Sequence, residues 1–193
     1  MGRLENKVAV ITGATSGIGL KTAERFVDEG ASVVLAARRV EEGEAIQKRL
    51  GDKTLFVKTD VLEEEDIANL VAKSAAHFGP IDAFFCNAGA GGVLAKISDI
   101  DASEFDRSVD ILLKNVFFCY KHVTKHMREN NGGSIVANAS VAATLGGFSS
   151  HFYSAMKAGV VSLSRSVAIE VAEHNIRVNT VSPGGIATGI FGK

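Results

Sequence analysis

Residues 12–19 read Thr-Gly-Ala-Thr-Ser-Gly-Ile-Gly, a glycine-rich stretch that lies between two apolar patterns. The preceding residues, 8–11, are Val-Ala-Val-Ile, which is typical of a buried strand. The apolar residues that follow recur at intervals of three and four, as on one face of a helix: Leu20, Ala23, Phe26 and Val27. The sequence therefore predicts a strand, a glycine turn and a helix in immediate succession.

The glycines of this turn favour a site for nucleotide phosphates. Gly13 can adopt a backbone angle that other residues reach only at a cost, and Gly17 and Gly19 lack the Cβ that would hold a ligand away. The first helical turn directs its free N–H groups, at the positive end of the helix dipole, toward a diphosphate. The spacing departs from the usual G-x-G-x-x-G fingerprint, and three glycines also fit an ordinary tight turn. The turn alone leaves both interpretations open.

The composition is that of an ordinary globular protein. The chain has 193 residues, which suits a single domain spanning 1–193, with 46% hydrophobic and 22% charged residues. A formal net charge of −1 gives no reason to expect nucleic acid or a membrane as a partner. No apolar run reaches the roughly 18 residues of a membrane span, and Cys86 and Cys119 both lie in apolar stretches. We expect two buried, reduced thiols and a cytoplasmic location.

Apolar strands and helical patterns alternate along the rest of the chain. We expect further strands at 31–36, 54–57, 81–86, 134–139 and 176–181, and helices at 40–50, 63–78, from an N-cap at Ser103 to about 129, and 151–173. This alternation predicts an α/β fold, a Rossmann-type doubly wound parallel sheet in three layers with helices on both faces. In such a sheet the ligand binds beyond the carboxyl ends of the strands.

Two arginines, Arg38 and Arg39, follow the second expected strand. NAD-binding enzymes usually place an acidic residue near this point to bind the ribose 2′-hydroxyl, whereas an arginine suits the 2′-phosphate of NADP. No acidic residue occurs from 33 to 39, so the sequence favours NADP(H) over NAD(H), with Arg38 as the phosphate ligand. The alternative is a pair of solvated arginines at the start of a charged helix.

Three residues form the strongest catalytic pattern: Ser140, Tyr153 and Lys157. Tyr153 and Lys157 are four residues apart on an expected helix, so they project from the same face. A tyrosine titrates at roughly pH 10, and a neighbouring ammonium lowers that pKa because it favours the phenolate. Ser140, at the end of the preceding strand, can hold a carbonyl oxygen. Tyr-x-x-x-Lys alone is common on surface helices, but its combination with the glycine turn and the strand-end serine is specific.

With these motifs the chain resembles the short-chain dehydrogenase/reductase (SDR) family over essentially its whole length. The matching motifs are the glycine turn, Asp60-Val61, Asn87-Ala88-Gly89, Ser140, residues 153–157 and Pro183-Gly184. The resemblance implies that Tyr153 is the general acid–base, that Lys157 lowers the pKa of Tyr153 and binds the nicotinamide ribose, and that Ser140 orients the substrate oxygen.

The resemblance also implies the cofactor-binding residues, with the glycine turn at the phosphates, Asp60-Val61 at the adenine and residues 183–188 at the nicotinamide. The full expected set is Gly13, Thr15, Ser16, Gly17, Ile18, Gly19, Arg38, Asp60, Val61, Asn87, Ala88, Gly89, Tyr153, Lys157, Pro183, Gly184, Ile186 and Thr188. No metal is implied, although His122 and His126 have the spacing of a ligand pair. Assembly as a homodimer or homotetramer through the two long helices is implied as well.

Two features depart from the family pattern. Leu112 occupies the position where many members carry an active-site Asn, which the family links to a proton relay through water and the lysine, and Asn115 lies one turn further on. Members usually continue beyond the equivalent of Lys193, so we expect the C-terminal lid and the last strand to be missing and the pocket to be open. A natural short form and a fragment of a longer chain both fit.

The sequence thus predicts an NADP-dependent oxidoreductase that passes a hydride between the nicotinamide and the carbonyl carbon of a secondary alcohol–ketone pair, with Tyr153 transferring the proton. An open, apolar pocket favours a small hydrophobic or cyclic substrate. The competing hypothesis is a catalytically weak NADP(H)-binding or oligomer-forming protein, and it depends on Leu112 and on the expected loss of the lid.

Overall fold

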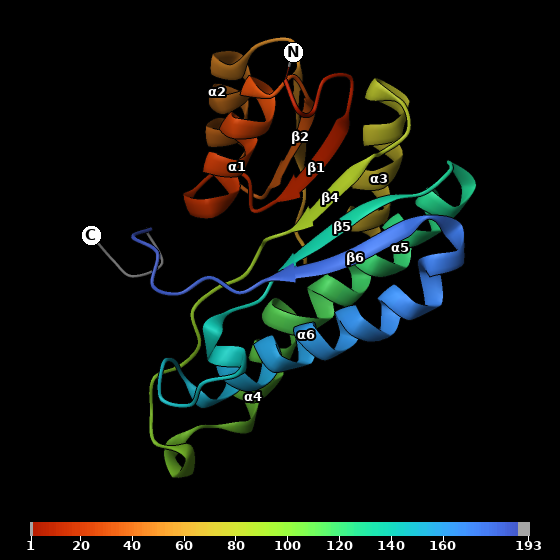
Figure 1. Ribbon diagram of the computed structural model, residues 1–193. Helices are drawn as coiled ribbons and strands as arrows, with labels where there is room; N and C mark the ends of the chain where they lie inside the picture. Colours follow the sequence, from red (N-terminus) through yellow and green to blue (C-terminus); the bar gives the residue numbers. More distant parts are fainter. Residues whose placement is uncertain (1, 189–193) are drawn as a thin grey trace.

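A computed structural model describes residues 2–188, in which six parallel strands form one sheet (Figure 1). The sheet order is β3-β2-β1-β4-β5-β6, and every neighbouring pair is parallel. The strands are β1 (Val8–Thr12), β2 (Ser32–Ala37), β3 (Thr54–Lys58), β4 (Ala83–Cys86), β5 (Gly133–Asn138) and β6 (Ile176–Val181). The order reverses direction between β1 and β4, which confirms the predicted doubly wound sheet. Residues 1 and 189–193 of the expected single domain lie outside the described part.

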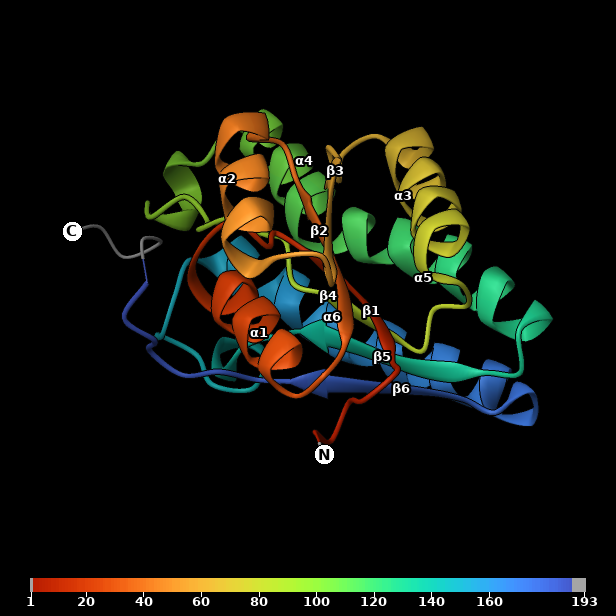
Figure 2. The same cartoon turned by 90° about the horizontal axis from the view of Figure 1, so that it is seen from above.

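Helices pack against both faces of the sheet and make three layers (Figure 2). One face carries α1 (Gly17–Asp28) and α2 (Val40–Leu50), and the other carries α3 (Glu64–Phe78), α5 (Asn115–Glu129) and α6 (His151–Val171). The remaining elements are α4 (Ala102–Val109), the π-helical η2 (Asp110–Lys114), and the 3-10 helices η1 (Ile97–Asp99), η3 (Val141–Ala143) and η4 (Ala172–His174). Of the helices in the described part, none is long and apolar enough to cross a membrane.

The strands bury both of their faces because successive side chains point to opposite sides. One cluster packs against α3, α5 and α6 and includes Val10, Val34, Phe84 and Ile135. The other packs against α1 and includes Ile11, Val33, Leu35 and Phe85. Cys86 and Cys119 are both buried and free, as predicted. This two-sided burial explains why the strands read as continuous apolar runs in the sequence.

The prediction of one helix from Ser103 to residue 129 is wrong in two respects. The N-cap is Asp101 and not Ser103. Asp101 has an extended backbone, and the helix begins at the next residue, Ala102. The helix is also interrupted by η2, where the Asn115 N–H bonds to the carbonyl of Asp110, five residues back. The side-chain Nδ2 of Asn115 donates to the carbonyl of Ile111. In a regular α-helix this carbonyl would accept the backbone N–H of Asn115. This side-chain substitution accounts for the local π turn.

Seven other predicted elements differ from the structure by one or two residues at their ends, and the largest differences are in β4 and α6. The fourth strand was expected from residue 81, but β4 begins at Ala83. The N–H of Ile81 donates to Nε2 of His126 at 3.1 Å, so a long-range contact satisfies this donor outside the sheet. The last helix ends at Val171 rather than at residue 173, and η4 then leads to Asn175 in the left-handed conformation.

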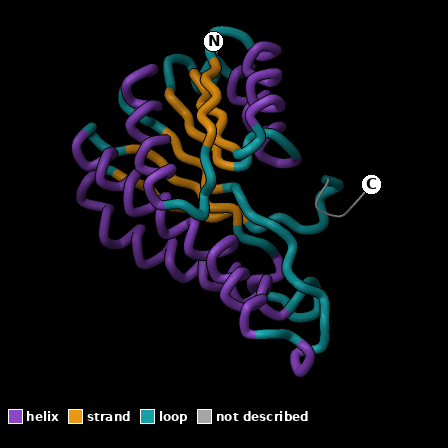
Figure 3. The backbone as a smooth tube through the Cα atoms, turned by 180° about the vertical axis from the view of Figure 1, so that it is seen from behind, coloured by secondary structure: helices purple, strands orange, loops and turns teal. Residues whose placement is uncertain are grey.

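The carboxyl ends of the strands all face one end of the molecule, as the arrowheads in Figure 1 show. The start of α6 and the long loop before α4 lie at this end, and Figure 3 shows the same loop extending away from the sheet. The glycine turn after β1 lies there as well. The topology therefore brings the predicted catalytic and cofactor-binding segments to one edge.

Candidate active site

The glycine turn has the backbone angle predicted at Gly13, and Gly17 and Gly19 have structural reasons of their own. Gly13 and Gly17 have φ values of +66° and +51°, in the left-handed region that favours glycine. Gly19 has no such angle, but a Cβ at this position would lie 2.6 Å from Asn87 Nδ2 and closer still to the carbonyl oxygen of Gly13. The α1 backbone can thus approach the end of β4 only because residue 19 has no side chain.

A cavity of about 360 Å³ lies over this turn and the end of the sheet. Its lining includes ten of the predicted site residues: Gly13, Ser16, Gly17, Ile18, Asn87, Ala88, Gly89, Tyr153, Lys157 and Thr188. It also includes three residues that were not in the predicted set: Arg39, Ala90 and Asn138. The glycine turn and the Tyr–Lys pair, distant in sequence, therefore share one cavity.

Several predicted residues do not line this cavity, namely Thr15, Gly19, Arg38, Asp60, Val61, Ser140, Pro183, Gly184 and Ile186. Ile186 joins Gly17, Ile18 and Thr188 in a neighbouring cavity of about 570 Å³. The Pro183 carbonyl accepts a hydrogen bond from the N–H of Val141 at 3.1 Å, which fixes the chain after β6 beside Ser140. The structure therefore brings about half of the predicted site residues to the cavity wall and leaves the others outside it.

A chain of hydrogen bonds joins the ends of β1, β4 and β5 under the cavity. Asn87 Nδ2 donates to the carbonyls of Thr12, at 2.9 Å, and Gly13, at 3.4 Å. Thr12 Oγ1 in turn accepts the N–H groups of Asn87 and Ala88, both at 3.0 Å. Asn138 Nδ2 donates to Asn87 Oδ1 at 2.9 Å. Three neighbouring strand ends are thus fixed relative to one another by polar side chains.

Lys157 is buried, with 4% of its surface exposed, on the side of α6 that faces the sheet. Its Nζ donates to the carbonyl of Asn138 at 2.6 Å and lies 5.7 Å from the centroid of the Tyr153 ring. Burial lowers the pKa of Lys157 from 10.5 to about 8, because the charged form loses water. The ammonium is still the main form at neutral pH. The two residues are neighbours on one helical turn, as predicted from their spacing.

Ser140 and Ser150 both act as caps. Ser140 Oγ accepts the N–H of Ala142 at 3.1 Å and caps η3 directly after β5. Ser150 Oγ accepts the N–H of Tyr153 at 3.3 Å and caps α6. A Ser hydroxyl retains its own donor after accepting one hydrogen bond. Ser140 can therefore still donate to a substrate oxygen, although it is 8% exposed.

The arginines after β2 have different surroundings. Arg38 Nη1 lies 3.9 Å from Asp60 Oδ2, and its side chain is 67% exposed. Arg39 Nη2 donates to Thr15 Oγ1 at 3.2 Å, and its Nη1 lies 2.8 Å from Glu42 Oε1. Arg39 is thus held over the glycine turn and lines the cavity, whereas Arg38 lies beside Asp60 and does not line it.

Leu112 occupies the π turn and is 1% exposed. A Cβ on Gly89 would lie 3.6 Å from Leu112 Cδ2 and 3.8 Å from Lys157 Nζ, so both side chains lie close to this glycine. Asn115 is also 1% exposed, and its amide donates to the Ile111 carbonyl rather than into the cavity. An apolar group therefore borders the lysine where the family pattern would place an amide.

The loops beside Tyr153 present apolar side chains to solvent. A Cβ on Gly92 would lie 3.0 Å from the Cβ of Tyr153, so the loop before α4 passes directly over the start of α6. The rings of Phe105 and Phe152 stack edge to face with centroids 5.1 Å apart. Exposed apolar residues on the flanking loops are Leu94, Ile97, Leu145 and Phe148. This surface suits an apolar substrate.

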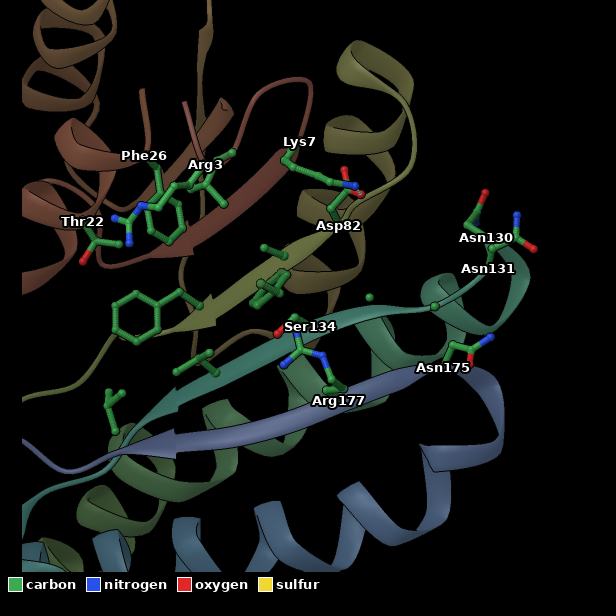
Figure 4. A pocket seen from close by; sticks show the side chains of 18 of the residues that line it. Arg3, Lys7, Thr22, Phe26, Asp82, Asn130, Asn131, Ser134, Asn175 and Arg177 are labelled. Carbon is green, nitrogen blue, oxygen red and sulfur yellow. Dashed lines mark hydrogen bonds and ion pairs between the residues drawn. The ribbon is translucent and has the colours of Figure 1, made fainter. Parts of the chain in front are cut away.

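A larger cavity, of about 840 Å³, lies away from Tyr153 and Lys157 (Figure 4). It occupies the sheet face beside α1, over β4 to β6, with Phe26 and Thr22 on one side and Ser134 and Arg177 on the other. Ile18 is the one predicted site residue that lines it in the described part of the chain. It brings no acid–base pair together with the glycine turn, so it is not the candidate active site.

Known proteins are similar to this chain in sequence and in fold. The family described as short chain dehydrogenase matches residues 7–193. Tropinone reductase-like 1 of Erythroxylum coca is 39% identical over 191 residues, which cover 97% of this chain and 70% of the relative. (+)-Borneol dehydrogenase 1 of Salvia officinalis is 39% identical over 189 residues, covering 97% and 73%. The crystal structure of a 3-ketoacyl-(acyl-carrier-protein) reductase from Brucella melitensis, complexed with NADH, has a TM-score of 0.92 and 34% identity, covering 97% of this chain and 79% of that one.

Proposed function

The chain belongs to the short-chain dehydrogenase/reductase family, and from that premise we propose that it interconverts a secondary alcohol and a ketone with NADP(H). It is an enzyme of the dehydrogenase/reductase class. The observation that carries the finer assignment is the shared cavity, in which Tyr153 and Lys157 lie beside the glycine turn. A proton-transfer pair and a phosphate-binding turn in one cavity are what hydride transfer to a carbonyl requires.

Tyr153 acts as the general acid–base and donates its phenolic proton to the carbonyl oxygen during reduction. The Lys157 ammonium stabilises the phenolate that this leaves, and its burial strengthens the attraction because little water screens it. The Ser140 hydroxyl donates a hydrogen bond to the same carbonyl oxygen and orients it, while its proton stays on Ser140. When bound, the nicotinamide supplies or accepts the hydride. In alcohol oxidation the proton returns from the substrate hydroxyl to Tyr153.

The residues present fit a dinucleotide, because the glycine turn and the N-terminus of α1 line a cavity of about 360 Å³. Gly13, Ser16 and Gly17 would hold the diphosphate at the N-terminus of α1. Asp60 and Val61 would contact the adenine, while residues 87–89 and 183–188 would surround the nicotinamide ring. Lys157 would also bind the nicotinamide ribose.

The choice of NADP(H) over NAD(H) rests on the arginines after β2. We propose that Arg38 binds the 2′-phosphate, with Arg39 as the second candidate because it lines the cavity. Replacing both by alanine should lower the ratio of kcat/KM for NADPH to that for NADH by at least about tenfold, since a hydrogen bond to a charged group contributes about 1.5–3 kcal/mol.

The single variants Arg38→Ala and Arg39→Ala then assign the effect to one arginine. The kcat/KM for NADH is the internal control, because NADH lacks the 2′-phosphate that these side chains are proposed to bind. An unchanged ratio in the double variant would contradict the assignment to NADP(H).

For the substrate, we propose a small hydrophobic or cyclic ketone and its alcohol. The exposed apolar side chains around Tyr153 support this, and the names of two relatives, a borneol dehydrogenase and a tropinone reductase-like protein, point to bicyclic compounds. The test is oxidation of NADPH by the purified chain with a panel of cyclic and bicyclic ketones. We expect turnover of at least one bicyclic member. Tight NADPH binding without turnover of any ketone would instead support the catalytically weak binding protein, a hypothesis that Leu112 beside Lys157 favours.

A further inference from the structure

Asn138 has an unusual position among the residues that line the cavity. Its backbone carbonyl accepts the Lys157 ammonium at 2.6 Å, and its side-chain Nδ2 donates to Asn87 Oδ1 at 2.9 Å. It ends β5, the strand between β4 and β6. One residue therefore connects the lysine of the Tyr–Lys pair with the strand end that carries Asn87.

The side-chain amide of Asn138 leaves one atom unsatisfied. Its Oδ1 is buried and has no hydrogen-bond partner among the described residues. A buried acceptor without a partner is unfavourable, and the simplest remedy is to turn the amide over so that Oδ1 and Nδ2 exchange places. The neighbouring contacts exclude that remedy.

The orientation of the Asn138 amide is determined by a chain of contacts that begins in the glycine turn. Asn87 must direct its Nδ2 toward the carbonyls of Thr12 and Gly13, because carbonyls can only accept. Asn87 Oδ1 therefore faces Asn138 and needs a donor. Only the Nδ2 of Asn138 can supply it, so the Oδ1 of Asn138 is left unpaired. The Oδ1 of Asn138 thus stays unpaired while its Nδ2 keeps the hydrogen bond to Asn87 Oδ1, which joins the ends of β5 and β4.

From these contacts we propose that Asn138 is a positioning residue, whose side chain holds its own carbonyl, and through it the Lys157 ammonium, in fixed register with Asn87 and the glycine turn. The proposal rests on the proposed function of Tyr153 and Lys157. It predicts that the donor on the side chain, and not its shape, is what matters. Misplacement of a catalytic group by about 1 Å can lower the rate by about a hundredfold.

Two variants separate the donor from the shape. Asn138→Asp keeps the size of the side chain but presents only acceptors to Asn87 Oδ1 when ionised, and Asn138→Ala removes the contact altogether. We expect kcat to fall at least about tenfold in both, with the Kd for NADPH measured by fluorescence changing less. The matched control is Asn179→Asp, the same substitution at an exposed position of the neighbouring strand β6, where kcat should stay at the wild-type value.

A second measurement does not depend on turnover. The ammonium signal of Lys157, identified by its loss in Lys157→Met, should be visible by NMR in the wild type at about pH 6, since hydrogen bonding and burial slow its proton exchange. We expect the signal to broaden or vanish in Asn138→Asp and Asn138→Ala and to persist in Asn179→Asp.

The outcomes are distinguishable from failure of the proposed function. If the wild type turns over no ketone, the function fails, while the NMR comparison still decides whether Asn138 positions Lys157. If the wild type is active and Asn138→Asp retains both its kcat and the lysine signal, the positioning role is refuted. If only a melting temperature changes, Asn138 is a purely structural residue and the proposal is wrong.

Discussion

Replacing Tyr153 by phenylalanine is expected to lower kcat for ketone reduction by about a thousandfold, within the range of 10² to 10⁴ that general acid–base catalysis contributes. The substitution removes the phenolic proton and keeps the aromatic ring. The Cβ of residue 153 still lies under the loop at Gly92, and the Lys157 Nζ still lies over the ring. The protein should therefore fold normally and bind NADPH with a Kd within about threefold of the wild type, since only the transferred proton is lost.

The chain offers a matched control, because its second tyrosine is Tyr120. Tyr120 is buried on α5, and its hydroxyl shares a hydrogen bond of 2.6 Å with Ser164 Oγ on α6. Tyr120→Phe should lower the free energy of unfolding by about 1 kcal/mol through loss of that bond, without changing kcat. Steady-state kinetics, cofactor titration and thermal unfolding of both variants make the comparison. If Tyr153→Phe kept kcat within tenfold of the wild type, Tyr153 would not be the acid–base.

The fold could be predicted from the sequence because the strongest patterns are local. The strands have both faces buried, so each reads as an apolar run, and the helices between them show apolar residues at spacings of three and four. α2 and β6 have the predicted bounds, since Gly51 ends the first and Asn175 precedes the second. The glycine turn was also predictable, because its positive φ values demand glycine.

The details that were missed depend on contacts between distant segments. In the π turn the Asn115 side chain donates to a carbonyl of its own helix, and before β4 His126 accepts the Ile81 N–H. Neither contact leaves a periodic signal. Asn138 could have been found, since it is a polar residue at a strand end like Asn87. Its role depends on the orientation of the Asn87 amide, which only the structure gives.

The second large effect is expected at Gly19, where substitution by alanine should weaken NADPH binding by about a hundredfold or more. The added Cβ would overlap the carbonyl oxygen of Gly13 and lie 2.6 Å from Asn87 Nδ2. Neither neighbour can move freely, because Gly13 is part of the turn and Asn87 is bonded to the Thr12 carbonyl at 2.9 Å. The N-terminus of α1 must therefore shift away from the strand ends. Overpacking of this kind also destabilises a fold by about 1–3 kcal/mol.

Loss of stability alone could mimic a loss of binding, so the control must destabilise the protein elsewhere. Gly51→Ala serves this purpose, because Gly51 has a φ of +85° at the end of α2 with no atom within 4 Å of an added Cβ. Backbone strain there should cost about 1–2 kcal/mol and leave the Kd for NADPH unchanged. Titrations are made well below the melting temperature of either variant. If Gly19→Ala bound NADPH as tightly as Gly51→Ala does, the N-terminus of α1 could be displaced without weakening cofactor binding. The turn after β1 would then not be the phosphate site.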